Sequence, residues 1–171
     1  MRIFVSLVIY TVVLAVLALS FPYWGVFDVA ASVPHTAFAR WYFGTLTDHS
    51  VERYSSGIKL PQEYFSASPI EGFRKYDKMC APCHGAPGIN KSDTAKGMMP
   101  EPPDLSKSVK DMKAEEVFWI VKNGIKMTAM PSFGKSRNDN DIWELAAFVK
   151  KLPEISPEVY SQFKEKYNPG K

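Results

Sequence analysis

The 171-residue sequence is poor in cysteine and histidine, with only two cysteines and three histidines. Both cysteines lie in one short run, so no disulfide framework remains to stabilise the chain. A structural zinc site needs four nitrogen or sulfur ligands, and His35 and His49 lie too far upstream of that run to supply them. The net charge is only +3, with both signs interspersed, which argues against a nucleic-acid partner.

Charge is absent from Ile3 to Phe27, and this stretch is about as long as a helix that crosses a bilayer. Arg2 precedes it, so the positive-inside rule predicts a single-pass anchor in the inner (cytoplasmic) membrane with the rest of the chain in the periplasm. Aromatic residues cluster at its far end, as at a membrane interface. A cleaved signal peptide, with Ala18-Leu19-Ser20 as the cleavage site, is the alternative.

The central motif is Cys80-Ala81-Pro82-Cys83-His84. A C-x-x-C-H run has the spacing that attaches haem c: Cys80 and Cys83 form thioethers with the vinyl groups, and His84 is the proximal iron ligand. A thioredoxin-like redox pair would require a βαβ pattern before the run, and none is present. The sequence therefore predicts one covalently attached haem c with its iron.

Residues 28–69 carry no obvious chemistry. A helix is expected after Val33-Pro34-His35, with an apolar face at helical spacing that includes Phe38, Trp41, Tyr42 and Leu46. Such a helix outside a membrane has three roles open to it: it lies on the lipid, covers the haem domain or docks to a partner subunit. The proline- and serine-containing stretch from Lys59 to Pro69 is interpreted as a linker.

Two further helices are expected to frame the haem region. One follows Pro69 and leads into the motif, so that it holds the cysteines at its end; the other begins near Asp139 and ends at Pro153. Gly72 offers a position without a side chain where the second helix can cross closely, and Leu145 and Phe148 would supply the facing apolar side chains.

Residues 70–153 resemble a class I c-type cytochrome, and the whole chain resembles small membrane-anchored mono-haem bacterial cytochromes. The resemblance maps the family's crossing of terminal helices onto Gly72 and Tyr76, with Leu145 and Phe148 as their partners. We therefore expect an all-α class I cytochrome c haem domain preceded by a transmembrane helix and a juxtamembrane amphipathic helix. The expected divisions are an anchor at 1–27, the juxtamembrane helix and linker at 28–69, the haem domain at 70–153 and a C-terminal tail at 154–171.

A second iron ligand is expected from the stretch Gly124 to Gly134. Its glycines and proline predict an irregular loop that can present the Met130 thioether, and the sequence Met130-Pro131 matches the M-P loop of the family. Met127 is the second choice.

The resemblance also implies a proline loop, Met99 to Leu105, in which a backbone carbonyl accepts a hydrogen bond from the proximal histidine. Pro103 is chosen for this role, with Pro102 as the alternative. Two roles are considered for Trp119: its indole N–H donates a hydrogen bond to a haem propionate, or the residue is an ordinary part of the core. Lys126 is a weak candidate for pairing with a propionate, because the family loop carries a basic residue there.

Histidine and methionine ligation predicts a single-electron carrier between a redox protein donor and an acceptor, because six-coordinate iron exchanges one electron without changing its ligands. The thioether also raises the reduction potential relative to two histidine ligands. Outside the haem site, no combination of acid, base and nucleophile predicts an enzyme. Two alternatives are a fixed subunit of a respiratory or dehydrogenase complex and a sensor that binds small ligands at an open iron site. Four lysines near the motif are either steering groups for an acidic partner or ordinary solvated surface residues: Lys75, Lys78, Lys91 and Lys96.

Overall fold

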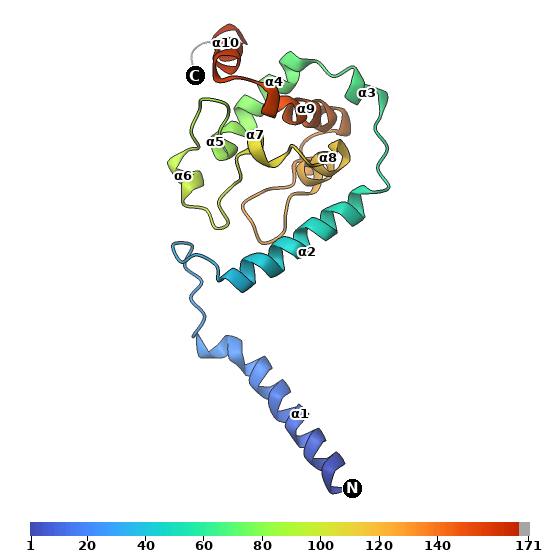
Figure 1. Ribbon diagram of the computed structural model, residues 1–171, viewed down its shortest axis with the longest axis vertical. Helices are drawn as coiled ribbons and strands as arrows, with labels where there is room; N and C mark the ends of the chain where they lie inside the picture. Colours follow the sequence, from blue (N-terminus) through green and yellow to red (C-terminus); the bar gives the residue numbers. More distant parts are fainter. Residues whose placement is uncertain (168–171) are drawn as a thin grey trace. The chain divides into compact units, whose positions relative to one another are not determined.

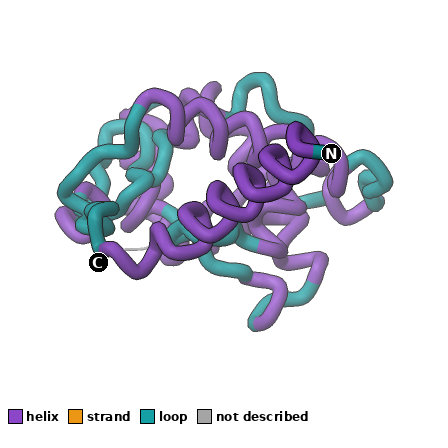
Figure 2. The backbone as a smooth tube through the Cα atoms, turned by 90° about the horizontal axis from the view of Figure 1, so that it is seen from below, coloured by secondary structure: helices purple, strands orange, loops and turns teal. Residues whose placement is uncertain are grey.

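The computed structural model describes residues 1–167 as helices joined by loops (Figure 1). Helix accounts for 65% of the chain, and the described residues contain no strand (Figure 2). An isolated bridge pairs Ala86 with Ile89. The all-α prediction is confirmed. The chain divides into two compact units, Met1–Val33 and Pro34–Lys171.

The first unit contains α1 (Arg2–Ser20) and the 3-10 helix η1 (Phe21–Trp24). Together they form a helical span that contains an 18-residue stretch with a mean hydropathy of 2.7, and none of its residues is buried. Its length and apolar composition fit a membrane-crossing helix, although a signal sequence has the same properties. Gly25, at φ +64°, follows the span in the left-handed conformation that commonly ends a helix.

The second unit is built on four helices of ten or more residues besides α2, together with shorter turns of helix. Its elements are α2 (Ala37–Ser55), α3 (Gln62–Phe65), α4 (Pro69–Met79), α5 (Ala81–His84), α6 (Asp93–Lys96), α7 (Leu105–Ser108), α8 (Ala114–Asn123), η2 (Phe133–Lys135), α9 (Asp139–Lys151), η3 (Leu152–Glu154) and α10 (Pro157–Tyr167).

Local sequence explains where the two framing helices begin. The Ser68 hydroxyl accepts a hydrogen bond from the Glu71 amide at 3.4 Å, and Pro69 occupies the first turn of α4. The Asn138 side chain accepts from the Asp141 amide at 2.9 Å and caps α9. These caps satisfy amide groups that would otherwise lack a partner, so the helices begin close to where the sequence predicts.

Helices α4 and α9 cross in direct backbone contact at Gly72. A Cβ atom added to Gly72 would lie 2.7 Å from Phe148 Cβ and 2.9 Å from the carbonyl oxygen of Glu144. The predicted close crossing is confirmed. Beside the crossing, Lys75 of α4 forms ion pairs with Asp141 and Glu144 of α9.

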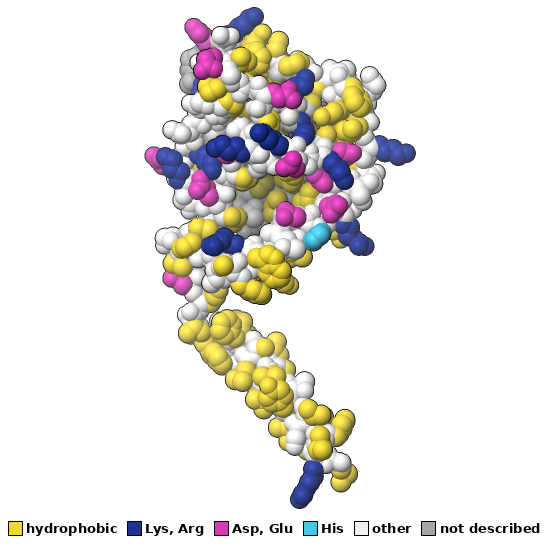
Figure 3. Space-filling model, viewed as in Figure 1, with side chains coloured by type: hydrophobic (Ala, Val, Ile, Leu, Met, Phe, Trp, Pro, Cys, Tyr) yellow, Lys and Arg dark blue, Asp and Glu magenta, His cyan; other side chains and the backbone are white. Residues whose placement is uncertain are grey.

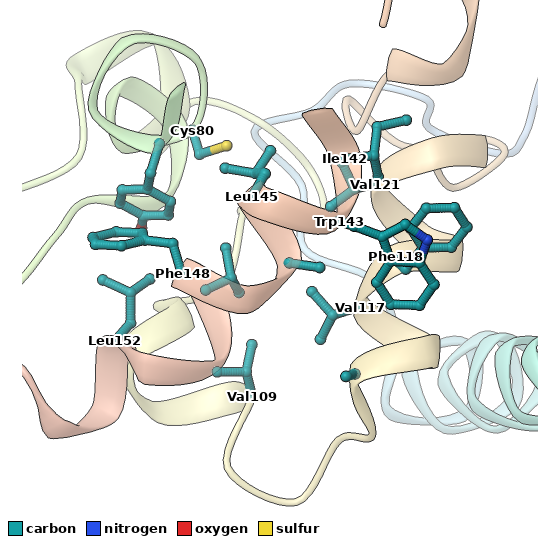
Figure 4. Close-up of a cluster of buried hydrophobic side chains, with 14 of the residues drawn as sticks. Cys80, Val109, Val117, Phe118, Val121, Ile142, Trp143, Leu145, Phe148 and Leu152 are labelled. Atoms are coloured by element: carbon teal, nitrogen blue, oxygen red, sulfur yellow. The ribbon is translucent and has the colours of Figure 1, made fainter. Parts of the chain in front are cut away.

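The hydrophobic core lies on both sides of α9. Figure 4 shows Leu145 and Phe148 on the side of Cys80, and Trp143 beside Phe118 on the other side. The rings of Phe118 and Trp143 stack with centroids 4.0 Å apart. Because α9 packs on both sides, almost all of its apolar side chains are buried. It is therefore the central helix of the unit.

The linker and the tail are more ordered parts of the second unit than the sequence suggested. Tyr64 of α3, in the stretch interpreted as a linker, packs edge-on against Trp143 at 5.7 Å. In α10, the fully buried Tyr160 packs on Phe73 at 5.2 Å, and its hydroxyl donates to Asp77 at 3.0 Å. Each segment packs on the rest of the unit through one or two aromatic side chains. So few residues do not produce a helical periodicity that the sequence alone could reveal. The tail expected at 154–171 thus includes α10, while residues 168–171 lie outside the described residues.

We predict that Gly72→Ala lowers the free energy of unfolding of the haem-loaded protein by about 1–3 kcal/mol, because the new methyl group forces α4 and α9 apart. Gly44→Ala is the matched control, since that helical glycine has nothing within 4 Å of the added atom. The control should be neutral or slightly stabilising. Denaturant titration followed by circular dichroism measures both; equal stability of the two variants would contradict a close crossing.

Candidate functional site

The two cysteines lie where α4 passes into the short helix α5. Cys80 ends α4, its amide donating to the Tyr76 carbonyl at 2.8 Å, and its own carbonyl accepts from the His84 amide at 2.8 Å. Cys80 is buried and Cys83 half-buried, and both are free thiols. Burial, and secondarily the neighbouring Cys83, raises the pKa of the Cys80 thiol to about 12, so this thiol is neutral before any attachment reaction.

The turn after the motif is held from behind by Tyr76. Its hydroxyl donates to the carbonyl oxygen of Gly85 at 2.6 Å, and its ring packs 5.5 Å from that of Phe148. Tyr76 is itself almost fully buried. The resemblance predicted an aromatic residue at the helix crossing. The structure gives its physical role: Tyr76 links the α4–α9 crossing to the end of the motif.

His84 is half-buried, and one of its ring nitrogens is already in use. Nδ1 lies 2.8 Å from the carbonyl oxygen of Pro103, and with Nδ1 as the donor the hydrogen bond leaves Nε2 as the acceptor nitrogen. Burial lowers the pKa of His84; the bond to Pro103 opposes this, and the nearby Lys91 adds to it. The imidazole is therefore neutral at pH 7, the form in which histidine binds a metal.

The proline loop gives its two candidate carbonyls to different partners. Pro103 faces His84, whereas the Pro102 carbonyl accepts from Lys91, which also pairs with Glu101 at 2.6 Å. The lysine ties the loop to the segment after the motif. Of the two prolines considered from the sequence, Pro103 is the one in contact with the histidine.

The Met130 loop is folded back on the end of α8. Gly124, at φ +69°, allows this close approach: a Cβ there would lie 2.7 Å from the Met130 carbonyl oxygen. The Ser132 hydroxyl donates to the Lys122 carbonyl at 2.8 Å, and the Met130 amide donates to the Thr128 hydroxyl at 3.1 Å. The loop is irregular in backbone but fixed at both ends, which suits it to hold one side chain in place.

Met130 and Met127 differ in exposure. Met130 is half-buried and packs against the hydrophobic core, whereas Met127 is 93% exposed. Met127 also has a φ of +60°, which turns the chain at the tip of the loop. Its position disfavours Met127 as an alternative iron ligand. Lys126, beside it, is exposed as well.

Trp119 is half-buried and lies against α2. Its ring stacks on that of Tyr54, with centroids 6.1 Å apart and planes 16° from parallel. Sequence pattern did not indicate this neighbour, because Tyr54 and Trp119 are 65 positions apart in the chain. A hydrogen bond from the indole to a propionate stays a prediction.

The four lysines differ in what they contact. Lys75 is committed to the ion pairs across the α4–α9 crossing, and Lys91 to the proline loop. Lys96 pairs with Asp93 at 2.9 Å within one turn, and Lys78 is exposed. Lys75 and Lys91 therefore serve internal contacts that lie beyond local sequence patterns.

The donor set fits a haem better than a bare metal ion. Within residues 1–167, no group of three or more His, Cys, Asp or Glu side chains is arranged to hold a metal ion. A haem needs fewer protein donors, since the porphyrin supplies the other iron ligands, and the site has two free thiols, a neutral imidazole and a thioether. In the space-filling view the second unit is hollowed beside α2, with hydrophobic side chains around the recess (Figure 3).

Comparison with known proteins assigns this region to a family. Residues 67–149 match the family model described as cytochrome C oxidase, cbb3-type, subunit III. No curated protein and no solved structure matches the chain. The matched residues begin just before α4 and end within α9, so they include the attachment motif, the proline loop and the Met130 loop. Residues 67–149 are therefore similar to a family of c-type cytochromes, proteins that hold haem c covalently.

Proposed function

We propose that this protein is a membrane-anchored, mono-haem c-type cytochrome that passes single electrons between redox partners in the periplasm or membrane. Cys80 and Cys83 would hold the haem through thioethers, and His84 and Met130 would bind its iron. The contact between His84 Nδ1 and the Pro103 carbonyl is the observation that carries the proposal, because it orients the imidazole and leaves Nε2 for iron.

Each protein group has a distinct role in this proposal. The bound haem supplies a one-electron couple. Pro103 fixes the tautomer and plane of His84, and Tyr76 stiffens the turn that follows it. The loop anchored at Gly124 and Ser132 holds the Met130 thioether against the core. Because hydrogen bonds and packing fix both donors, the iron would keep the same ligands in both redox states, which favours rapid electron transfer.

The proposed location follows from the first unit. The span Arg2–Trp24 is the anchor in the inner membrane, and the charge of Arg2 keeps the N-terminus in the cytoplasm. The haem region is then in the periplasm, where both thiols are available for attachment.

A second candidate is a fixed subunit of a respiratory complex. The description of the matching family, subunit III of a cbb3-type oxidase, favours it. In that case the electron donor and acceptor are neighbouring subunits rather than diffusing proteins. The same ligand set serves both candidates, so co-purification of stoichiometric partners from native membranes distinguishes them.

We predict that Met130→Ala converts a low-spin haem that is indifferent to carbon monoxide into one that binds it rapidly, because the sixth ligand is lost. Met130→His should restore a low-spin, unreactive site at a lower reduction potential. Met127→Ala, at the exposed tip of the same loop, is the matched control and should leave the spectrum and the free energy of unfolding unchanged within about 0.5 kcal/mol.

Absorption spectra of the oxidised and reduced proteins, with and without carbon monoxide, measure these outcomes. Rapid carbon monoxide binding by the wild-type protein would reject Met130 as a ligand and favour the small-ligand sensor. An effect of Met127→Ala as large as that of Met130→Ala would show that the loop, and not one thioether, controls the iron.

We predict that the double variant Cys80→Ala, Cys83→Ala lacks covalent haem and is largely unfolded in its second unit. The reason is that the haem region at 70–153, about 85 residues of that unit, buries little surface without the cofactor. Intact-mass spectrometry should show one haem on the wild-type chain and none on the variant. A cooperative, native-like melt of the variant by circular dichroism would contradict the predicted dependence of folding on haem.

A further inference from the structure

Helix α2 has two opposite faces with different environments. Its C-terminal half packs on the second unit: Val51 and Ser55 are buried, and Tyr54 stacks on Trp119 of α8. At 3.6 residues per turn, Tyr42 and Val51 lie on roughly opposite sides of the helix. Of the residues predicted from the sequence to form the apolar face, Phe38, Tyr42 and Leu46 lie on the side away from Val51, and Trp41 lies at the edge of that side.

That apolar face remains exposed in the structure. The exposed fractions are 69% for Phe38, 64% for Trp41, 50% for Tyr42 and 57% for Leu46. We call these four residues the aromatic face. The rings of its three aromatic residues contact one another, and the centroid of the Phe38 ring lies 5.8 Å from that of Trp41 and 5.9 Å from that of Tyr42. In the space-filling view hydrophobic side chains gather along this part of α2 (Figure 3). Of the three roles open from the sequence, covering the haem domain does not apply to this face.

Charge changes sharply along the helix. From Val29 to Thr47 no acidic residue occurs, and Arg40 is the only lysine or arginine. Asp48, Glu52 and Arg53 follow in the half that packs on α8. An apolar, aromatic surface with one cation and no anion is complementary to a lipid surface with anionic headgroups. Tryptophan and tyrosine are also the residues enriched at membrane interfaces.

Chain connectivity restricts what this face can reach. Only residues 25–36 separate the end of η1 at Trp24 from the start of α2 at Ala37. Even fully extended, that connector spans at most about 45 Å. If Arg2–Trp24 crosses the bilayer, α2 is held within that distance of the point where the chain leaves the membrane.

We propose that the N-terminal half of α2 lies on the bilayer, with the aromatic face inserted among the lipids and the charged C-terminal half in water. This inference rests on the membrane anchor of the proposed function. The chain then holds the membrane at two places, the spanning helix and α2. Because α2 also packs on α8, the helix that leads into the Met130 loop, lipid binding sets how the haem region faces the membrane.

The test uses spin labels on the full-length, haem-loaded protein in nanodiscs of phosphatidylcholine and phosphatidylglycerol. Haem attachment consumes both native thiols, so each introduced cysteine is unique. Tyr42→Cys and Leu46→Cys report on the aromatic face, and Glu52→Cys is the matched control farther along the helix. Collisions with oxygen and with a water-soluble nickel chelate are measured in the reduced protein, so that ferric iron does not relax the label.

Labels at positions 42 and 46 should collide more with oxygen than with nickel, and the label at position 52 should show the reverse order. Equal access of nickel at positions 46 and 52 would overturn the proposal and leave the face for a partner protein. A label shielded from both reagents would also overturn it, since that result indicates a protein contact such as a second copy of the chain.

A further label separates this inference from the anchor on which it rests. Val13→Cys lies in the middle of α1 and should show strong oxygen access with little nickel access. If position 13 shows bilayer depth and position 46 does not, the anchor stands and the lipid-bound α2 is rejected. If position 13 is also open to nickel, both are rejected. The haem spectrum of the same samples reports separately on iron ligation.

Discussion

The contact between α4 and α9 at Gly72 is the constraint on which the rest of the second unit depends. It brings Phe148 and the Glu144 carbonyl to distances from Gly72 that a larger residue could not accommodate. Because Cys80 ends α4, this crossing also sets where the attachment motif begins. Tyr76 extends the same contact, since its ring lies on Phe148 and its hydroxyl holds Gly85 beyond the motif. The packing of α4 on α9 therefore fixes the positions of Cys80 and of the turn that follows His84.

The remaining donors come from loops, and each loop is fixed by a few directed hydrogen bonds. Lys91 holds the proline loop through Pro102 and Glu101, which leaves the Pro103 carbonyl to His84. The Met130 loop is closed by contacts to the end of α8. Loops held in this way carry function without the large apolar area of a helix, because most of their polar groups are satisfied locally.

The peripheral helices contribute in different ways. Helix α10 adds Tyr160 to the core over Phe73 and pairs with Asp77, so the tail supports α4 from outside. Helix α2 packs on α8 through its less apolar side and leaves its aromatic face uncovered. Hydrophobic periodicity indicates which residues share a face. It does not indicate whether protein or lipid covers that face, because both exclude water in the same way.

The sequence by itself determined the features that depend on neighbouring residues: the apolar span before Trp24, the attachment motif, the boundaries of α4 and α9, and the need for a glycine at their crossing. These follow from spacing, caps and hydropathy, which act within a few residues. Tertiary structure decided the features that join distant segments. It committed Lys75 and Lys91 to internal ion pairs, stacked Trp119 on Tyr54, exposed Met127 while half-burying Met130, and placed the Pro103 carbonyl on His84. Such contacts depend on where the chain returns in space, and no local pattern of residues encodes that position.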